Sequence, residues 1–382
     1  MGFHEFSSPY DWSRIAAYKR TAKAAFGGMI DLSVGSPVDP VPDSVRKALA
    51  VAANDPNAYG YPATAGTADL RAAIAEWFSA ARNVDLQAIH ADVVPTVGSK
   101  EGVALMASLL HFGEDDVVVQ PKVSYPTYEI GTQLAGAQAL KVDDVADVAS
   151  WRNVPGVKAV WVNSPCNPTG EVYSAERMAG IVAAAREIGA VVLSDECYAL
   201  MQWRGATNSA DDDPLQSTPC ALRSDVCAGS AEGVLVLYSL SKQSNMAGYR
   251  TAFIAGDESL IASMSAYRKQ IGQIIPGPVQ AAMAAGLRDL ESVKVQHARY
   301  RERLGVLVSA LRAYGYCTDM PDGALYVWVR AKSGDCWTDM EQLAKIGIIA
   351  SPGEFYGAPE CLRFSATASD EAIASAAERL AR

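Results

Sequence analysis

The sequence from about residue 92 to residue 270 alternates short runs of β-branched residues with longer, alanine-rich stretches of helical pattern. This alternation is typical of βαβ units, in which parallel strands are joined by helices that cover the faces of a sheet. A helix is predicted at 175–188, for example, because Ser174 can cap its N-terminus and Gly189 can end it. The pattern predicts strands at 92–97, 116–120, 157–163, 190–195, 233–239 and 250–255.

The pattern changes after residue 276 and predicts a second, smaller part of the chain. Its expected elements are long helices at about 278–315, a strand pair near 325–330, a strand near 361–365 and a helix capped by Ser369. We therefore expect an α/β protein whose mainly parallel central sheet, flanked by helices, forms a large domain at 46–284. The smaller α+β domain is expected to combine residues 1–45 with 285–382, and the stretch 205–230 is interpreted as a surface loop.

Charge and composition narrow the classes of function. The 382-residue chain carries 33 basic and 43 acidic residues, a net charge of −10, which disfavours binding to a nucleic acid backbone. It has no apolar run long enough to span a bilayer, and its N-terminus lacks the pattern of a secretory signal. The seven cysteines form no CxxC pair and the four histidines are scattered, so no metal site is expected. These features predict a cytoplasmic protein with free thiols.

Ligands of parallel α/β sheets bind beyond the carboxyl ends of the strands, so the polar residues that follow the predicted strands are the candidates for chemistry. Gly98, Ser99 and Lys100 follow the first predicted strand and open a helix. Their backbone N–H groups and the Ser99 hydroxyl could hold a phosphate. A Gly-Ser helix start is more often a plain N-cap, so this motif alone is a weak signal.

Two further strand ends carry unusual polar groups. The third predicted strand is followed by a Pro/Gly-rich segment at 163–170, which on its own indicates a turn. Its two X-Pro bonds are candidates for cis peptides that would hold Asn167 against a ligand. Asp195 ends the fourth predicted strand directly after an apolar run. It is either a helix or turn cap, or a buried carboxylate with a cationic partner such as a protonated pyridine nitrogen.

A lysine and an arginine follow the fifth predicted strand. Lys242 comes after the hydroxyl residues Ser239 and Ser241, and Arg250 lies eight residues beyond it. A lysine at a strand end is usually solvated, but one that faces a carboxylate on a neighbouring strand is what a Schiff-base enzyme requires. Arg250 has the forked geometry that suits a phosphate dianion, although a surface salt bridge is the commoner role of a single arginine.

Taken together, these motifs resemble the signature of fold-type I, class I and II aminotransferases, which depend on pyridoxal 5′-phosphate. The similarity rests on the segments Asn-Pro-Thr-Gly at 167–170, Asp-Glu-Cys-Tyr at 195–198 and Ser-Leu-Ser-Lys at 239–242 with Arg250. Within this family the chain most resembles the actinobacterial N-succinyldiaminopimelate aminotransferases. That closer similarity rests on the segments 31–40, 124–129, 244–250, 325–328 and 352–357.

The resemblance implies how the cofactor ring is held. Lys242 matches the lysine that forms a Schiff base with the cofactor and then acts as general base and acid. Asp195 matches the carboxylate that keeps the pyridine nitrogen protonated. Asn167 and Tyr198 match donors to the phenolate oxygen, and Tyr125 matches an aromatic side chain stacked on the ring.

The resemblance also implies how the phosphate and the substrate are bound. The phosphate ligands would be Ser99, Lys100, Ser239, Ser241 and Arg250. Tyr61 matches a tyrosine that reaches the phosphate of the other subunit, which implies a homodimer with shared active sites. Arg363 matches the arginine that binds the substrate α-carboxylate, and Gly35 and Asn167 match further contacts to the substrate.

Three functions remain open from the sequence. The first is transamination from glutamate to a keto acid, with the N-succinyl keto precursor of diaminopimelate as the expected acceptor. The second is a lyase on the same fold, for example a carbon–sulfur lyase, because the outcome depends on which Cα bond is held perpendicular to the ring. The third is an inactive binding module of the same shape. Tyr10, Trp12, Arg268 and Lys269 are weak candidates for binding the distal end of the acceptor.

Overall fold

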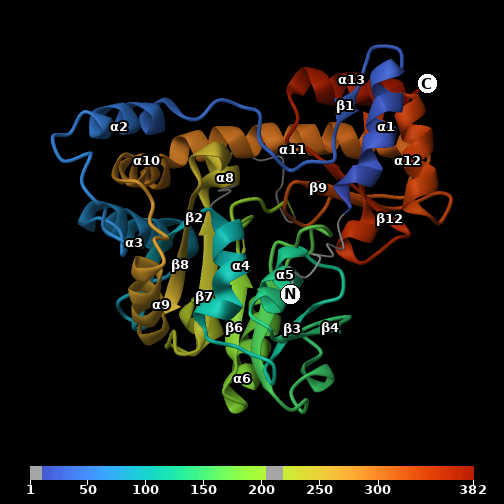
Figure 1. Cartoon of the computed structure of the whole chain (residues 1–382). Coiled ribbons are helices and arrows are strands. Elements are labelled where there is room, and N and C mark those ends of the chain that lie inside the picture. Colours follow the sequence, from blue (N-terminus) through green and yellow to red (C-terminus); the bar gives the residue numbers. More distant parts are fainter. Residues whose placement is uncertain (1–10, 204–217) are drawn as a thin grey trace, which may run out of the picture.

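The computed structural model describes residues 11–203 and 218–382, and its centre is a seven-stranded sheet (Figure 1). The strand order is β2-β8-β7-β6-β5-β3-β4, and all pairs are parallel except those that β8 makes with β2 and β7. The mainly parallel sheet is therefore confirmed, with one strand reversed. The strands are β2 (Ala91–Val97), β3 (Val117–Pro121), β4 (Gln138–Val142), β5 (Val157–Asn163), β6 (Val191–Asp195), β7 (Val234–Ser239) and β8 (Thr251–Asp257).

All six strands expected for this sheet are present, within two residues of the predicted ends. The sequence pattern missed β4, an edge strand of five residues in which Gln138 and Lys141 are exposed. Its short, half-polar sequence carries too weak a signal, and its pairing with β3 defines it. The helix α6 (Ala175–Glu187) is capped by Ser174 as predicted, because the Ser174 hydroxyl accepts from the backbone N–H of Arg177.

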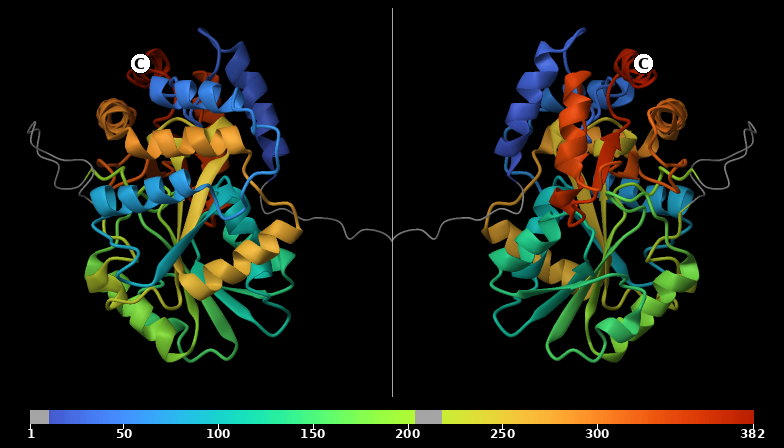
Figure 2. Two further views of the ribbon diagram at one scale, coloured as in Figure 1. Left: turned by 90° about the vertical axis from the view of Figure 1, so that its left-hand side faces the viewer. Right: turned by 90° about the vertical axis from the view of Figure 1, so that its right-hand side faces the viewer.

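Helices cover both faces of the sheet (Figure 2). One face packs against α4 (Ser99–Leu109), α5 (Thr127–Leu134) and α9 (Glu258–Gln270). The other packs against α3 (Ala68–Arg82), α6 and α10 (Gly277–Arg288), beside the short helix α7 (Ser224–Cys227). Strand β7 shows the alternation that this requires: Leu235 and Leu237 face the first set of helices, whereas Val236 and Tyr238 face the second. Each such buried side chain stabilises the fold by about 1.5–3 kcal/mol.

The C-terminal part of the chain builds a second core around a three-stranded antiparallel sheet. The order is β11-β12-β9, and the predicted strand pair near 325–330 is wrong, because that segment is the single strand β9 and its partner is β12. Ser369 caps the last helix as predicted. The elements are β9 (Tyr326–Arg330), β11 (Ser351–Pro352), β12 (Cys361–Ser365), α12 (Cys336–Lys345) and α13 (Asp370–Leu380).

Segments from the N-terminus join this second core. The short strand β1 (Ile30–Asp31) pairs in parallel with β10 (Ile348–Ile349), and α1 (Trp12–Ala24) packs on α12 (Figure 1). The chain then crosses to α2 (Asp43–Ala53), which packs on α10. The 24-residue helix α11 (Leu290–Ala313) runs between the two parts of the molecule, as Figure 1 shows. The domain boundaries expected from the sequence stay a prediction.

The expectation of a surface loop at 205–230 is wrong for its described part. Residues 204–217 lie outside the described residues, but Thr218, residues 220–222, Val226 and Cys227 are buried, while 224–225 and 228–229 are exposed. Cys220, Leu222 and Cys227 are inaccessible to solvent and join the core beside α6. The segment contains buried cysteines and the short helix α7, which a surface loop would not have. The polar residues between them led the sequence pattern to predict a loop. In the described residues, no helix is long and apolar enough to cross a membrane.

A buried ion pair fixes the end of β6. Arg82, the last residue of α3, donates from Nη2 to Glu196 at 2.7 Å, and both side chains are 1% exposed. Glu196 also accepts from the backbone N–H of Ala221 and from the Ser194 hydroxyl, while Arg82 reaches Thr218. The pair therefore joins α3, β6 and the start of the segment 218–230. Such a pair adds little net stability, but removing one partner leaves an uncompensated buried charge.

We expect Arg82→Met to lower the free energy of unfolding by about 3–5 kcal/mol, because Glu196 is left buried without its cation. The double variant Arg82→Met/Glu196→Gln should recover most of this loss, since no buried charge remains. Urea unfolding followed by circular dichroism measures both. As a control, Arg288→Gln removes exposed ion pairs with Asp69 and Glu76 and should cost less than about 1 kcal/mol. Equal losses for the buried and the exposed pair would contradict the prediction.

Candidate active site

A cavity of about 430 Å³ lies beyond the carboxyl ends of the central strands, between the two parts of the molecule. It brings together all but one, Tyr61, of the cofactor- and substrate-binding residues that the family resemblance implied. Lys242 and Asp195 line this same cavity, which is the arrangement that one pyridine ring between them requires. The predicted site residues in the cavity wall are Gly35, Ser99, Lys100, Tyr125, Asn167, Asp195, Tyr198, Ser239, Ser241, Lys242, Arg250 and Arg363.

Asp195 is a buried carboxylate at the end of β6, with 6% of the residue exposed. Its Oδ2 accepts from the hydroxyl of Tyr128 at 2.7 Å, and its Oδ1 accepts from the backbone N–H of Cys197 at 3.2 Å. Burial raises the pKa of Asp195, although these two hydrogen bonds act in the opposite direction. Within residues 11–203 and 218–382 no basic side chain pairs with it. A cationic ligand in the cavity would supply the missing charge.

Tyr128 was not singled out in the sequence. It lies on α5, three residues after Tyr125, which precedes the helix, and its ring stacks on Trp161 with the centroids 4.5 Å apart. This packing fixes the direction in which its hydroxyl points. Tyr128 belongs to the matching segment 124–129, but no role was assigned to it from the sequence.

Lys242 lies in the short helix α8 (Leu240–Gln243), directly after β7. Ser239 caps this helix, because its hydroxyl accepts from the backbone N–H of Ser241 at 3.1 Å. Burial lowers the pKa of Lys242, and the nearby cations Arg363 and Arg250 act in the same direction. Its Nζ donates to the backbone carbonyl of Gly35. A lowered pKa increases the neutral fraction of the amine, which is the nucleophilic form.

An anion could bind at the end of the cavity where α4 begins. Ser99 is the first residue of α4, so free backbone N–H groups face this end, and Arg250 lies beside them. Gly98 has a φ of +79°, and a Cβ atom there would overlap the Arg250 guanidinium. The hydroxyls of Ser239 and Ser241 lie 2.8 Å apart and also line the cavity. Glycine at position 98 therefore permits the close approach of the arginine.

Arg363 projects from β12 and is held at the opposite side of the cavity. Its guanidinium lies over the ring of Tyr326, 3.9 Å from the centroid, and 4.8 Å from that of Tyr356. It donates to the side-chain oxygen of Asn167 at 2.7 Å and to the backbone carbonyl of Ser33 at 2.8 Å. Its Nε–H is buried without a hydrogen-bond partner among the described residues. A bound carboxylate would satisfy that donor and the positive charge.

Tyr326 also sets the position of two other predicted residues. Its hydroxyl lies 2.6 Å from that of Tyr198. A Cβ atom on Gly35 would overlap the Tyr326 hydroxyl, so glycine is needed there for the tyrosine to reach the cavity. The sequence comparison included Tyr326 and Tyr356 in matching segments but gave them no role.

The remaining candidates differ in their positions. The Asn167–Pro168 and Ser164–Pro165 bonds are both cis, as the sequence suggested for this segment. Tyr61 is 102% exposed and does not line the cavity of its own chain. Trp12 does line the outer cavity, whereas Arg268 is buried in an ion pair with Glu101 at 2.8 Å and, like Lys269, lies outside it. Tyr10 lies outside the described residues.

These groups fit pyridoxal 5′-phosphate. The buried carboxylate of Asp195 suits a cationic ring nitrogen, the amine of Lys242 suits an aldehyde, and the start of α4 with Arg250 suits a phosphate. Tyr125 adds an aromatic wall. Arg363 remains for the carboxylate of an amino acid.

Comparisons with known proteins agree with this fit. The family described as aminotransferase class I and II matches residues 27–380. A 4-dedimethylamino-4-oxo-anhydrotetracycline transaminase of Streptomyces rimosus is 40% identical, with 97% of this chain and 98% of that protein covered. A protein of Mycobacterium tuberculosis named as a probable aminotransferase is 39% identical, with 97% and 84% covered. The structure of a probable N-succinyldiaminopimelate aminotransferase from Thermus thermophilus has a TM-score of 0.81 at 27% identity, with 97% and 99% covered.

We expect Asp195→Asn to stabilise the cofactor-free protein at pH 7 and to weaken its binding of pyridoxal phosphate. The reason is that the pKa of Asp195 is raised in the folded protein, so its ionisation costs stability as the pH rises above the usual range of an aspartate. Thermal melts of the cofactor-free wild type and variant from pH 4 to 8 measure this difference in stability. Tyr128→Phe is the comparison variant with an expected change of opposite sign. Loss of the Tyr128 hydrogen bond should destabilise the cofactor-free protein. A less stable Asp195→Asn protein at pH 7 would refute the assignment of an unbalanced charge.

Proposed function

The chain belongs to the aminotransferase class I and II family, whose members depend on pyridoxal 5′-phosphate, and we propose that it transfers the amino group of glutamate to an N-succinylated keto acid, the precursor of N-succinyl-L,L-diaminopimelate. The observation that carries this proposal is that the amine of Lys242, the carboxylate of Asp195 and the guanidinium of Arg363 line one cavity. These groups provide a nucleophile, an anion for a cationic ring and a cation for a substrate carboxylate.

The cofactor supplies an aldehyde for the amino group and a cationic ring that takes up the electrons left when Cα loses its proton. The chain's own residues do the rest. Asp195 maintains the charge on the ring nitrogen, since its buried carboxylate is stabilised by a cation and by Tyr128. Lys242 Nζ would take the proton from the substrate Cα and return it to the cofactor carbon that bears the amino group. The lowered pKa of Lys242 suits this role, because the neutral amine can accept a proton.

Arg363 binds the α-carboxylate. Two of its five N–H groups donate to Asn167 and Ser33, which leaves three, including Nε–H, for a forked contact with the ligand. Because Asn167 accepts from Arg363 through its side-chain oxygen, its amide N–H groups would be available to donate to the cofactor's phenolate oxygen. Tyr198 joins them as a second donor when the hydroxyl of Tyr326 donates to it.

The succinylated acceptor is supported by the similarity to the Thermus thermophilus structure and by the closer matching segments of the sequence. The identity of 40% to a tetracycline transaminase favours a second candidate, a bulky cyclic ketone. The outer cavity is compatible with such a ring, because Trp12 and Tyr356 give it aromatic walls. The two candidate functions differ only in the molecule that accepts the amino group, and the reaction is transamination in both.

We expect the purified protein to be yellow and to lose its pyridoxal absorbance band when glutamate is added, because the amino group moves to the cofactor. A panel of keto acids should then restore the band, fastest with the N-succinylated acceptor. Lys242→Ala should bind the cofactor loosely and show neither change. Restoration only by a cyclic ketone would select the second candidate. Release of pyruvate from cystathionine, with no response to glutamate, would instead identify a lyase.

The active enzyme is proposed to be a cytoplasmic homodimer. Tyr61 is fully exposed and lies outside its own cavity, beside the exposed ring of Tyr59, so it is available to a second chain. The phosphate end of the cavity includes the exposed Arg250, where a hydroxyl from the partner subunit would complete the cradle. The seven cysteines are all free, which suits a reducing compartment.

Mixed dimers provide the test of shared sites. Tyr61→Ala should weaken cofactor binding and Lys242→Ala should abolish turnover. If each site uses Tyr61 of the partner subunit, a dimer of one Tyr61→Ala chain and one Lys242→Ala chain keeps one complete site. Turnover at limiting cofactor should therefore reappear after the two inactive variants are refolded together. If mass spectrometry demonstrates mixed dimers but turnover does not recover, Tyr61 does not contribute to the active site of the partner subunit.

A further inference from the structure

Residues 33–40, here called the strap, contain no helix or strand, and their first four residues line the cavity. We infer that Asp39 is a positioning residue: its ion pair with Arg303 holds the strap against Lys242 and Arg363 and so sets the affinity for carboxylate substrates. This inference rests on the proposed function of the same site. Asp39 itself does not line the cavity.

The strap supplies backbone acceptors to two cations of the site, Arg363 and Lys242. The carbonyl of Ser33 accepts from Arg363 at 2.8 Å, and the carbonyl of Gly35 accepts from Nζ of Lys242. Between them, the carbonyl of Val34 accepts from the hydroxyl of Thr367 at 3.1 Å. A shift of the strap would therefore move the acceptors that orient both the substrate-binding and the proton-carrying side chains.

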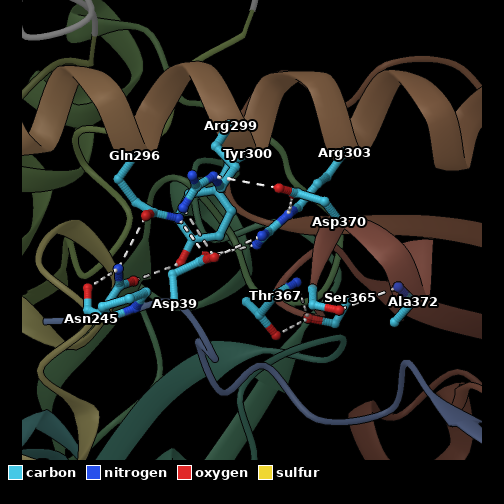
Figure 3. Close-up of polar contacts among 12 residues, drawn as sticks. Asp39, Asn245, Gln296, Arg299, Tyr300, Arg303, Ser365, Thr367, Asp370 and Ala372 are labelled. Carbon is cyan, nitrogen blue, oxygen red and sulfur yellow. Dashed lines mark hydrogen bonds and ion pairs between the residues drawn. The ribbon is translucent and has the colours of Figure 1, made fainter. Parts of the chain in front are cut away.

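The far end of the strap is anchored on α11 (Figure 3). Arg303 donates to Asp39 in a fork, from Nη1 to Oδ2 and from Nη2 to Oδ1, each at 2.7 Å. Gln296 and Arg299 donate to the same carboxylate at 2.9 and 3.2 Å. Burial alone would raise the pKa of Asp39, but the hydrogen bonds from Arg303 and Gln296 outweigh it and lower the pKa. The carboxylate is thus ionised at neutral pH, and Arg303, 3% exposed, is neutralised by it.

The same cluster reaches the segment that carries Lys242. Asn245, three residues after the lysine, donates to the side-chain oxygen of Gln296 at 3.0 Å and to the strap carbonyl of Pro40 at 3.2 Å. The hydroxyl of Tyr300 donates to Asn245 at 3.1 Å, and Figure 3 shows these side chains meeting beneath α11. Asp39 is therefore the point at which the strap, α11 and the Lys242 segment are joined.

A second carboxylate on Arg303 offers a matched control. Asp370, the first residue of α13, accepts from Nε of Arg303 at 2.6 Å but has no hydrogen bond or ion pair with the strap in the described structure. Its side chain is 58% exposed, so its loss leaves the arginine paired with Asp39. If the cluster only stabilises the fold, variants of the two carboxylates should differ in stability but neither should change KM. If Asp39 acts through the strap, the two should differ in KM.

The experiment compares Asp39→Asn with Asp370→Asn, after wild-type protein has shown its response to glutamate. Asp39→Asn should raise KM for glutamate about 10-fold with a smaller change in kcat, and should weaken binding of the dicarboxylate inhibitor maleate by a similar factor. Cofactor affinity should stay near that of wild type, because none of the proposed phosphate ligands hydrogen-bonds to the strap in the described part of the chain. Asp370→Asn should leave KM and maleate binding near wild type.

Hydrogen–deuterium exchange on the cofactor-free proteins gives a readout that is independent of activity. Backbone amides of the strap should exchange faster in Asp39→Asn than in Asp370→Asn or wild type. If Asp39→Asn folds poorly, Arg303→Lys keeps the positive charge, loses the fork, and should show the same rise in KM and the same faster exchange.

Two outcomes would overturn the inference: unchanged KM and exchange in Asp39→Asn, or equal changes in Asp370→Asn. A wild-type protein that does not respond to glutamate would instead refute the proposed function.

Discussion

The structure depends on one electrostatic constraint, a carboxylate buried at the end of a central strand without a protein cation among the described residues. Asp195 accepts hydrogen bonds from Tyr128 and from the backbone, but these do not remove its charge. A buried charge is costly unless it is paired, so this position favours a bound cation over an empty cavity. In a family of pyridoxal-phosphate enzymes, the cationic ring of the cofactor meets that need. Binding of the cofactor and balance of the charge are then the same event.

The neighbouring residue shows that the chain can balance a buried carboxylate when no ligand is needed. Glu196 follows Asp195 in the sequence, but it is held by Arg82 and by hydrogen bonds from Ser194 and Ala221. Successive side chains at a strand end point to opposite sides, which separates the two environments. One acid is thereby fixed by the protein, while its neighbour remains open to the cavity. This separation allows a structural ion pair and a ligand-dependent charge to lie side by side.

The cations of the site are positioned by contacts that cross between the two parts of the molecule. Arg363 comes from the small antiparallel sheet, yet it rests on Ser33 of the strap and on Asn167 beyond the central sheet. Lys242 comes from the central sheet, yet its amine contacts Gly35 of the strap. A motion of one part relative to the other would therefore change both cations together. Because both side chains contact the strap, a change in the relative position of the two parts would also change the affinity for substrate.

The sequence by itself determined the strand and helix segments and the polar residues at the strand ends, because hydrophobic period and caps such as Ser174 and Ser369 are local properties. Only the tertiary structure decided the reversed direction of β8, the presence of β4, the pairing of β9 with β12 and the burial beyond Thr218. It also decided that Tyr128 reaches Asp195 and that Asp39 reaches Arg303. These contacts join residues that are 67 and 264 positions apart. Their partners depend on how distant segments pack, and no local pattern in the sequence encodes that packing.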